Sequence, residues 1–306
     1  MQEAAGAQMF RKANNLARQY TFPVVISQKT FNGVCSSGIG TYVVINNDGW
    51  IVTAGHVIEQ ISSLIAAEAQ AVAYEAQRVS IQNDVALSEG EKRRHLRQLG
   101  SANPKAVNRI SCWWGIDGCQ LVDITHLPQG DLAIGRLNPF DPTKVTAYPT
   151  FKDPTKDYEP GVSLCKLGFP FHEITPQWDS ARNAFTLPPG TVPLPIFPIE
   201  GILTRIIELD FTQSGVPLPP FPIRMLETSS PGLRGQSGGP TFDAEGVIWA
   251  IQSKTNHLAL GFSPPVPGGK KGQKEHQFLN VGWGVHMTTV LGFFDQYKIA
   301  YEMSKY

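Results

Sequence analysis

The chain has 306 residues, with 26 basic and 26 acidic side chains and a formal net charge of zero. Balanced charge gives no reason to expect nucleic acid or a membrane surface as a partner, and no run of about 18 apolar residues predicts a membrane-spanning helix. The 29 glycines and 24 prolines favour a loop-rich, mostly β fold over a helical bundle.

Four cysteines are too few to require a disulfide framework in a chain of this length. Cys112 and Cys119 have a spacing that would let them face each other across a hairpin, but free thiols in a reducing compartment are the simpler interpretation. No pair of Cys or His residues has metal-ligand spacing, so we expect no metal and no cofactor. The first 20 residues lack the apolar core of a secretory signal, and we expect a cytoplasmic protein.

In chain order, apolar spacing predicts an N-terminal helix within residues 1–20, followed by strands that begin at residue 21. The sequence "NDG" between two apolar runs indicates a hairpin turn. At about 58–100 the period changes to that of a helix, breaks at "QNDVAL", and restarts with a capping box from Ser88 to Glu91. This pattern predicts a helical hairpin inserted into the β structure.

Strand patterns return after residue 100 and continue to a linker rich in Asp, Pro and Thr at about 138–160. A second group of strands follows, with two proline-rich segments that we expect to be extended surface loops. An amphipathic helix is predicted from residue 287 towards the end of the chain. The predicted division is therefore 1–20, 21–150, 151–286 and 287–306.

Four glycines surround one hydroxyl in "GLRGQSGGPTF", which contains Ser237. A hydroxyl is a poor nucleophile unless a base lies within hydrogen-bonding reach and a third group orients the base. His56 in "TAGHV" and Asp131 in "GDLAIGRL" lie at strand ends and supply those groups in the order His, Asp, Ser. Two other acids, Asp117 and Asp123, lack the strand context of Asp131.

These three motifs together resemble those of trypsin/chymotrypsin-like serine proteases, and among these the HtrA-type and bacterial trypsin-like peptidases. "SSGIGTYVVINNDG" and "GWGVHMTTVLGFF" resemble further segments of the HtrA protease domain. The resemblance covers about residues 21–60 and 105–300 and excludes the helical insertion. It implies an all-β fold of two antiparallel six-stranded β-barrels, residues 21–150 and 151–286, with the helical hairpin inserted in the first.

The resemblance also implies the roles of individual residues. Ser237 is the expected nucleophile, His56 the general base and Asp131 the group that orients His56. The backbone N–H groups of Gly235 and Ser237 are the expected oxyanion hole. The remaining histidines lack such context and are interpreted as structural or solvent-facing: His95, His126, His172, His257, His276 and His286.

The primary specificity pocket is expected around Pro231, Gln252 and Ser253, with walls from residues 229–236 and from "AIQSKT", residues 250–255. Because Pro231 stands where trypsin-like enzymes with basic specificity carry an acid, we expect a small or medium apolar residue before the scissile bond instead. No cysteine flanks His56 or Ser237, which agrees with an intracellular setting. Gln236 replaces the aspartate of zymogen-activated relatives, which indicates that cleavage of the N-terminus does not activate this enzyme.

Three functions remain open. The first is a serine endopeptidase acting on protein or peptide substrates through an acyl-enzyme. The second is a catalytically silent protease-like module that binds a protein partner, with the helical insertion as the candidate regulatory surface. The third is another serine hydrolase such as an esterase, which is disfavoured because β segments, and not a strand-to-helix turn, surround "GQSGG".

Overall fold

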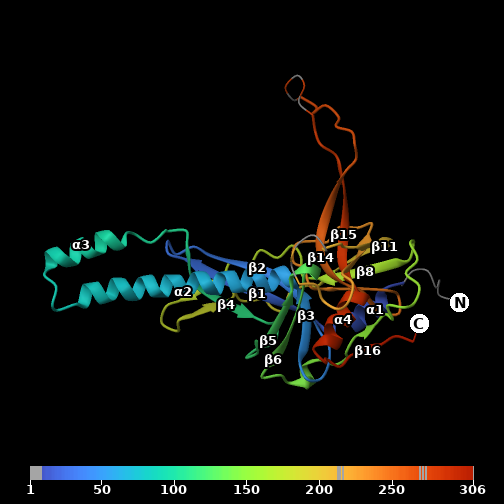
Figure 1. The fold of residues 1–306 in the computed structure, drawn as a ribbon, viewed down its shortest axis with the longest axis horizontal. Helices are drawn as coiled ribbons and strands as arrows, with labels where there is room; N and C mark the ends of the chain where they lie inside the picture. The colour runs from blue at the N-terminus through green and yellow to red at the C-terminus, as the bar shows by residue number, and fades with distance from the viewer. Residues whose placement is uncertain are drawn as a thin grey trace.

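The computed structural model describes residues 9–211, 215, 217–268, 270, 272 and 274–305. Within these residues two β-sheets form the body of the protein, and a long helical arm and a long β-hairpin project from it (Figure 1). Side chains from both sheets share one apolar interior, since Tyr42 and Leu132 of the first sheet and Phe242 and Val285 of the second belong to the same buried cluster. The two sheets therefore fold as one unit.

The first sheet is antiparallel throughout and has the order β4-β1-β2-β3-β6-β5. Its strands are β1 (Thr21–Thr30), β2 (Cys35–Val44), β3 (Trp50–Ala54), β4 (Val107–Trp113), β5 (Gln120–Leu127) and β6 (Leu132–Asn138). The expected hairpin joins β2 to β3, with Gly49 at φ +81°, where glycine is favoured. The end strands β4 and β5 are not paired with each other, so this half is a curled open sheet and not the closed barrel predicted.

The second sheet closes on itself. The order β13-β8-β11-β12-β15-β14 returns to β13, because β13 pairs with both β8 and β14. The strands are β8 (Ser163–Gly168), β11 (Phe197–Glu208), β12 (Arg224–Thr228), β13 (Pro240–Phe242), β14 (Ile248–Ala259) and β15 (Phe278–His286). This is the six-stranded antiparallel barrel predicted. Two short strands, β7 (Thr150–Phe151) and β16 (Glu302–Met303), extend it in parallel, and β9 (Gln177–Asp179) and β10 (Ala184–Thr186) form a separate hairpin.

Both terminal helices are shorter than the sequence indicated. Helix α1 spans Arg11–Ala17, and residues 1–8 of the predicted helix lie outside the described residues. Helix α4 spans Met287–Gln296. Lys298 then adopts φ +56°, outside the helical region, and the chain returns to the second sheet as β16. The predicted helix 287–306 therefore ends at residue 296, because its last residues pair as a strand.

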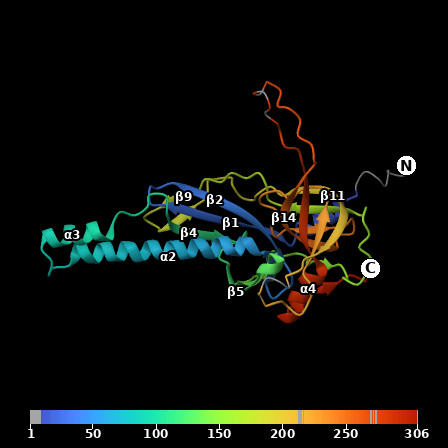
Figure 2. The same cartoon turned by 45° about the horizontal axis from the view of Figure 1, so that its top comes forward.

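The predicted helical hairpin forms the arm. Helix α2 (Gly55–Asn83) is about 43 Å long at 1.5 Å per residue, and helix α3 (Glu89–Leu99) runs back along it (Figures 1 and 2). The capping box at Ser88 and Glu91 is formed. The insertion begins three residues earlier than predicted, so the first turn of α2 contains His56.

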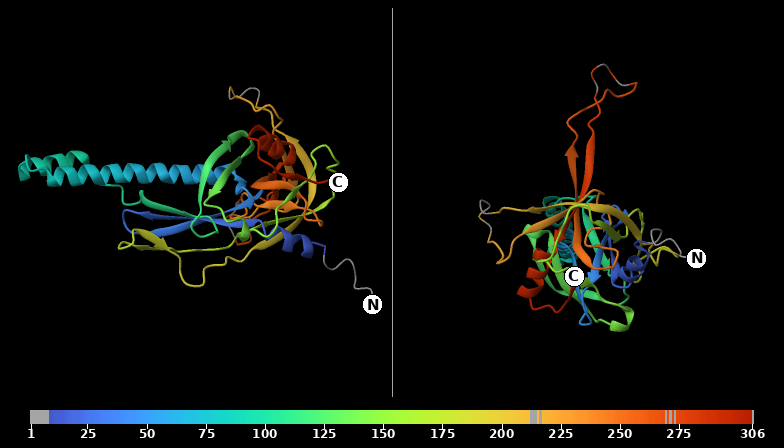
Figure 3. Two further views of the ribbon diagram at one scale, coloured as in Figure 1. Left: turned by 90° about the horizontal axis from the view of Figure 1, so that it is seen from below. Right: turned by 90° about the vertical axis from the view of Figure 1, so that its right-hand side faces the viewer.

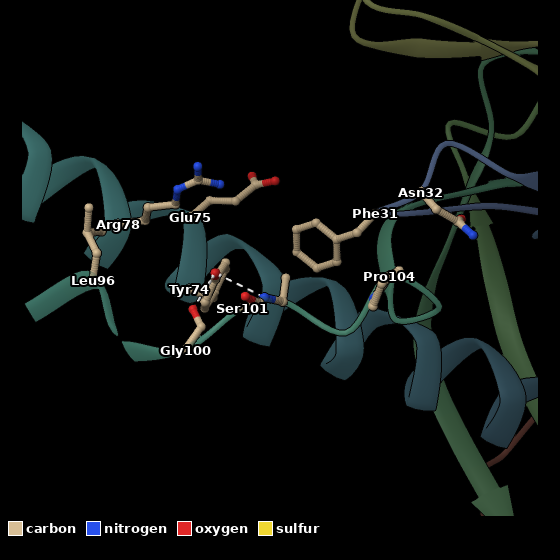
Figure 4. A pocket seen from close by; sticks show the side chains of 10 residues that line it. Phe31, Asn32, Tyr74, Glu75, Arg78, Leu96, Gly100, Ser101 and Pro104 are labelled. Atoms are coloured by element: carbon tan, nitrogen blue, oxygen red, sulfur yellow. Dashed lines mark hydrogen bonds between the residues drawn. The ribbon is translucent and has the colours of Figure 1, made fainter. Parts of the chain in front are cut away.

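Hydrogen bonds and one ion pair join helix α2 of the arm to the first sheet and to the segment after α3. The Tyr74 hydroxyl donates to the carbonyl oxygen of Gly100 at 3.0 Å and accepts from the N–H of Ala102 at 3.1 Å, and Figure 4 shows Tyr74 beside Phe31 in a hollow of about 490 Å³. Arg109 of β4 pairs with Glu75 of α2 at 3.3 Å. These contacts hold α2 and the segment after α3 against the first sheet.

The second projection is the hairpin of β14 and β15, which continues beyond the barrel in a different direction from the arm (Figures 1 and 3). Among the described residues, no helix is long and apolar enough to cross a membrane.

Candidate active site

His56 reaches its position because β3 ends at Ala54 and α2 begins at once with Gly55. The Gly55 N–H donates to the carbonyl oxygen of Asp131 at 2.9 Å. A β-carbon at Gly55 would lie 2.5 Å from His126 Nε2 and 3.0 Å from the carbonyl carbon of Asp131. The missing side chain therefore lets the start of α2 approach residue 131 closely.

Asp131 lies between a short 3₁₀ turn (Pro128–Gly130) and β6, at φ +48°. Aspartate is among the few non-glycine residues that tolerate this left-handed conformation. Its Oδ1 accepts the backbone N–H of His56 at 2.8 Å, and its Oδ1 and Oδ2 lie 3.1 and 3.0 Å from His56 Nδ1. The Ser253 hydroxyl donates to Oδ2. The carboxylate is thus held by three donor groups and fixes the imidazole.

Each partner shifts the titration of the other. The hydrogen bond that His56 donates to Asp131 raises the pKa of His56 above its ordinary value, against the opposing effect of burial. Burial alone would raise the pKa of Asp131, but the hydrogen bond and charge of His56, together with the Ser253 hydroxyl, lower it overall. Asp131 therefore stays ionised at neutral pH, and the proton on Nδ1 faces it.

Ser237 lies on the loop between β12 and β13, which is pinned against both sheets. The N–H of Thr41 in β2 donates to the Ser237 carbonyl at 2.9 Å, and the Thr41 hydroxyl donates to the Gly235 carbonyl at 2.6 Å. Gly238, at φ +86°, packs so closely that a β-carbon would overlap Thr41 O and Thr53 Oγ1. The glycines around Ser237 are explained by this close backbone packing.

His56, Asp131 and Ser237, the three predicted catalytic residues, line one cleft of about 810 Å³. Ser237 Oγ donates to the Ser253 carbonyl at 3.4 Å, and within the described residues it makes no hydrogen bond to His56. The histidine–aspartate contact is therefore formed, and the serine lies in the same cleft with its hydroxyl directed elsewhere.

The two amides predicted as the oxyanion hole are free. The N–H groups of Gly235 and Ser237 have no acceptor in the described part of the chain. Gly235 has φ +100°, and a β-carbon there would overlap the Phe169 carbonyl oxygen. Between them Gln236 is fully buried; its side chain accepts from Leu233 N–H at 3.0 Å and donates to the Phe197 carbonyl at 3.3 Å.

The three residues predicted for the specificity pocket line the cleft, but two of them have a further role. A register shift in β14 takes Ser253 out of the ladder, and its hydroxyl binds Asp131. The Gln252 side chain donates to the carbonyls of Lys254 and Trp283 at 3.3 and 3.2 Å. Pro231 lines the cleft, as predicted.

Five of the other cleft residues lie within the predicted walls, 229–236 and 250–255: Gly232, Leu233, Arg234, Lys254 and Thr255. Two more, His257 and Asn280, were not predicted. His257 is solvent-facing, as expected, but it lies in the cleft wall. The signal for it was the predicted wall "AIQSKT", because the same strand continues from that segment through residue 257.

The rival groups have other partners. Asp117 accepts from the Trp113 indole at 2.8 Å, and Asp123 pairs with Arg136 at 2.8 Å. His286 caps α4 by accepting from Thr288 N–H, and burial lowers its pKa to about 4. None of these lines the cleft.

Lys166 of β8 is a buried cation behind the cleft, with 1% of its surface exposed. Its ammonium group donates to Thr228 Oγ1 at 3.0 Å and to the carbonyl oxygens of Ser230 and Pro231 at 2.5 and 2.8 Å. Burial lowers the pKa of Lys166 to about 7, whereas the three oxygens around it favour the charged form. Lys166 thus fixes the start of the nucleophile loop.

Among the described residues no cluster of His, Cys, Asp or Glu has the arrangement of a metal site. The four cysteines, Cys35, Cys112, Cys119 and Cys165, are free thiols.

Comparison with known proteins gave one family match: the model of the trypsin-like peptidase domain matches residues 40–251, more than half of the chain. No curated protein sequence matches. Among solved structures, the active form of the Rv3671c protease from M. tuberculosis is similar, with 12% identity and a TM-score of 0.49, covering 99% of this chain and 91% of that one. The HtrA-type protease AlgW with tripeptide is 14% identical with a TM-score of 0.46, and the alignment covers 94% of this chain and 63% of AlgW.

Proposed function

This chain belongs to the trypsin-like peptidase family and is a serine peptidase, and on that premise we propose that it is an endopeptidase acting through His56, Asp131 and Ser237. The observation that carries this proposal is the contact of His56 Nδ1 with both oxygens of Asp131 in the cleft that also contains Ser237. With Nδ1 facing the carboxylate, Nε2 is the nitrogen left to accept a proton.

The proposed reaction follows from these positions. Rotation of the Ser237 side chain away from Ser253 brings Oγ towards His56 Nε2, which takes its proton as Oγ attacks the carbonyl carbon of the substrate. The imidazolium then gives that proton to the leaving nitrogen, the C–N bond breaks, and an acyl-enzyme remains. Water, deprotonated by the same imidazole, releases the acid and restores the Ser237 hydroxyl.

We assign the developing oxyanion to the unpaired N–H groups of Gly235 and Ser237. An amide without an acceptor, held on a rigid loop, needs no rearrangement when charge appears, and one such donor is typically worth about 3 kcal/mol in the transition state. The buried Gln236 between them is satisfied by Leu233 and Phe197. This neutral arrangement supports our prediction that a newly cut N-terminus is not needed for activity.

The substrate backbone is proposed to lie along β14. From Lys254 to Ala259 this strand pairs with β15 on one edge, and the described residues place no strand on the other edge. An extended peptide adds to such an edge by backbone hydrogen bonds. Across the cleft the Thr255 hydroxyl donates to the Gly232 carbonyl at 2.5 Å. This link narrows the space for a side chain and, within the predicted range of small or medium apolar residues, favours a small one before the scissile bond.

A second candidate is a silent module that binds a protein partner through the arm. Two observations favour it: Ser237 makes no hydrogen bond to His56, and Ile65, Val72 and Val79 recur every seven residues on α2 with about half of each side chain exposed. A regulatory partner on the arm is also compatible with an active enzyme, because the first turn of α2 contains His56. The cytoplasmic location stays a prediction from the sequence.

Hydrolysis of a fluorescent casein by wild type, Ser237→Ala and His56→Ala separates these candidates. Loss of a triad member typically costs about a million-fold in turnover, so both variants should fall to background while keeping the wild-type circular dichroism spectrum. Wild-type protein that is folded and cuts no faster than Ser237→Ala contradicts the proposed endopeptidase and favours the binding module.

A further inference from the structure

Cations outnumber free carboxylates among the residues that line the cleft. Arg234 and Lys254 both line it, whereas Asp131 is the one carboxylate among the lining residues, and its oxygens are engaged by His56 and Ser253. Arg234 is exposed and has no ion-pair partner in the described part of the chain. Lys254 is also exposed, and the contact of its ammonium is the ring of Trp283 at 5.3 Å. Two cations without an ion-pair partner therefore line the same cleft.

The hairpin beside them adds one hydrogen-bond donor. His257 Nδ1 lies 2.6 Å from Asn280 Oδ1, so Nδ1 carries the proton and donates it to that oxygen. The amide NH₂ of Asn280 has no acceptor among the described residues, and both side chains line the cleft. This wall thus presents an amide donor and no carboxylate.

The backbone at the floor of the cleft also presents a donor and no acceptor. The carbonyl oxygens of Ser230 and Pro231 are turned inward onto the buried Lys166 ammonium. In a trans peptide the C=O and the following N–H point in opposite directions, so the N–H of Gly232 points away from Lys166. It has no acceptor in the described part of the chain, and Gly232 lines the cleft. The carbonyl oxygens of Ser230 and Pro231 are therefore not available to bind a basic side chain of the substrate. The N–H of Gly232 is available to bind an acceptor.

We propose that the cleft selects acidic polypeptide segments, with Asp or Glu within a few residues of the scissile bond held by Arg234 and Lys254. The link between Thr255 and Gly232 bars deep insertion of a long side chain, so the acidic groups bind at the rim, where these cations lie, and a small residue supplies the scissile carbonyl. The inference rests on the proposed endopeptidase function and names its substrate class.

The test compares internally quenched peptides that share one small residue before the scissile bond and differ only in the flanking residues: Asp and Glu, Asn and Gln, or Lys and Arg. Exposed ion pairs are individually weak but act together here, so we expect kcat/KM for the acidic peptide to exceed that for the amide peptide about tenfold, and the basic peptide to be cut most slowly. Raising the salt concentration should shrink the acidic-to-amide ratio.

The variant Arg234→Gln/Lys254→Gln should reduce the acidic-to-amide ratio from about ten to about one. The matched control, Arg93→Gln/Lys105→Gln, removes two exposed cations remote from the cleft and should leave the ratio unchanged. A wild-type ratio near one, a preference for the basic peptide, or an equal loss in both double variants overturns the inference.

Binding to Ser237→Ala distinguishes failure of the inference from failure of the proposed function. Fluorescence anisotropy with the labelled acidic and amide peptides should show about tenfold tighter binding of the acidic one. If Ser237→Ala binds the acidic peptide more tightly but wild type cuts no peptide, the endopeptidase is contradicted and the charge selection is supported. Cleavage by wild type with equal binding of both peptides contradicts charge selection alone.

Discussion

Ser253→Ala tests whether catalysis depends on the hydrogen bond that the Ser253 hydroxyl donates to the Asp131 carboxylate. Ser253 is 2% exposed and its hydroxyl donates to Asp131 Oδ2. Removing a hydrogen bond to a charged group costs about 1.5–3 kcal/mol. If this loss raises the activation free energy by about 2 kcal/mol, kcat/KM falls roughly 30-fold.

The assay is peptide hydrolysis measured beside urea unfolding of each variant. Ser27→Ala is the matched control, because Ser27 is 4% exposed and its hydroxyl lies 3.2 Å from Ser37 Oγ in the first sheet, outside the cleft. It should keep kcat/KM within about twofold. Since residues that act as a unit are not additive, Ser253→Ala should add almost nothing in the background of Asp131→Asn.

Three results would refute this reasoning: activity of Ser253→Ala within twofold of wild type, an equal loss in Ser27→Ala, or full additivity with Asp131→Asn. Each would show that the Ser253 hydroxyl does not act through the carboxylate of Asp131.

Three further predictions concern titration and stability. Asp131 raises the pKa of His56, and the base must be neutral, so activity should be lost as pH falls through a pKa above the ordinary histidine value. Asp131→Asn should move this acidic limb of the kcat/KM profile to lower pH. An acidic limb at the same pH in Asp131→Asn contradicts the pairing of His56 with Asp131. Lys166→Met leaves buried oxygens without their donor, and unfolding in urea should show a loss of about 3 kcal/mol, against almost none for exposed Lys105→Met. Tyr74→Phe should weaken the arm root by about 1 kcal/mol, seen as faster hydrogen exchange in α3; unchanged exchange refutes this role.

His56 and Asp131 were predictable because each stands in a short motif at a strand end, and Ser237 because closely packed glycines surround it in a loop. The roles of Ser253, which binds Asp131, and of His257, which lines the cleft, were not predictable in the same way. Their roles depend on a register shift in β14 that displaces Ser253 from the ladder, and such shifts leave no mark in the pattern of apolar residues.

Lys166 shows a different limit of the sequence. A lysine within a strand is normally interpreted as solvent-facing, and only the three oxygens gathered around its ammonium explain its burial. The C-terminal helix was predicted too long for a related reason. The apolar spacing continues past Gln296, but the ring of Tyr301 packs against Phe151, and Glu302–Met303 pair with the short strand β7.

The central claim is that Ser237 is made nucleophilic by His56. Labelling with a fluorophosphonate, followed by mass spectrometry of the digested protein, tests it most directly. We expect a single phosphonyl adduct on Ser237 in wild type and almost none in His56→Ala. An adduct on another residue, or equal labelling of folded His56→Ala, would contradict it.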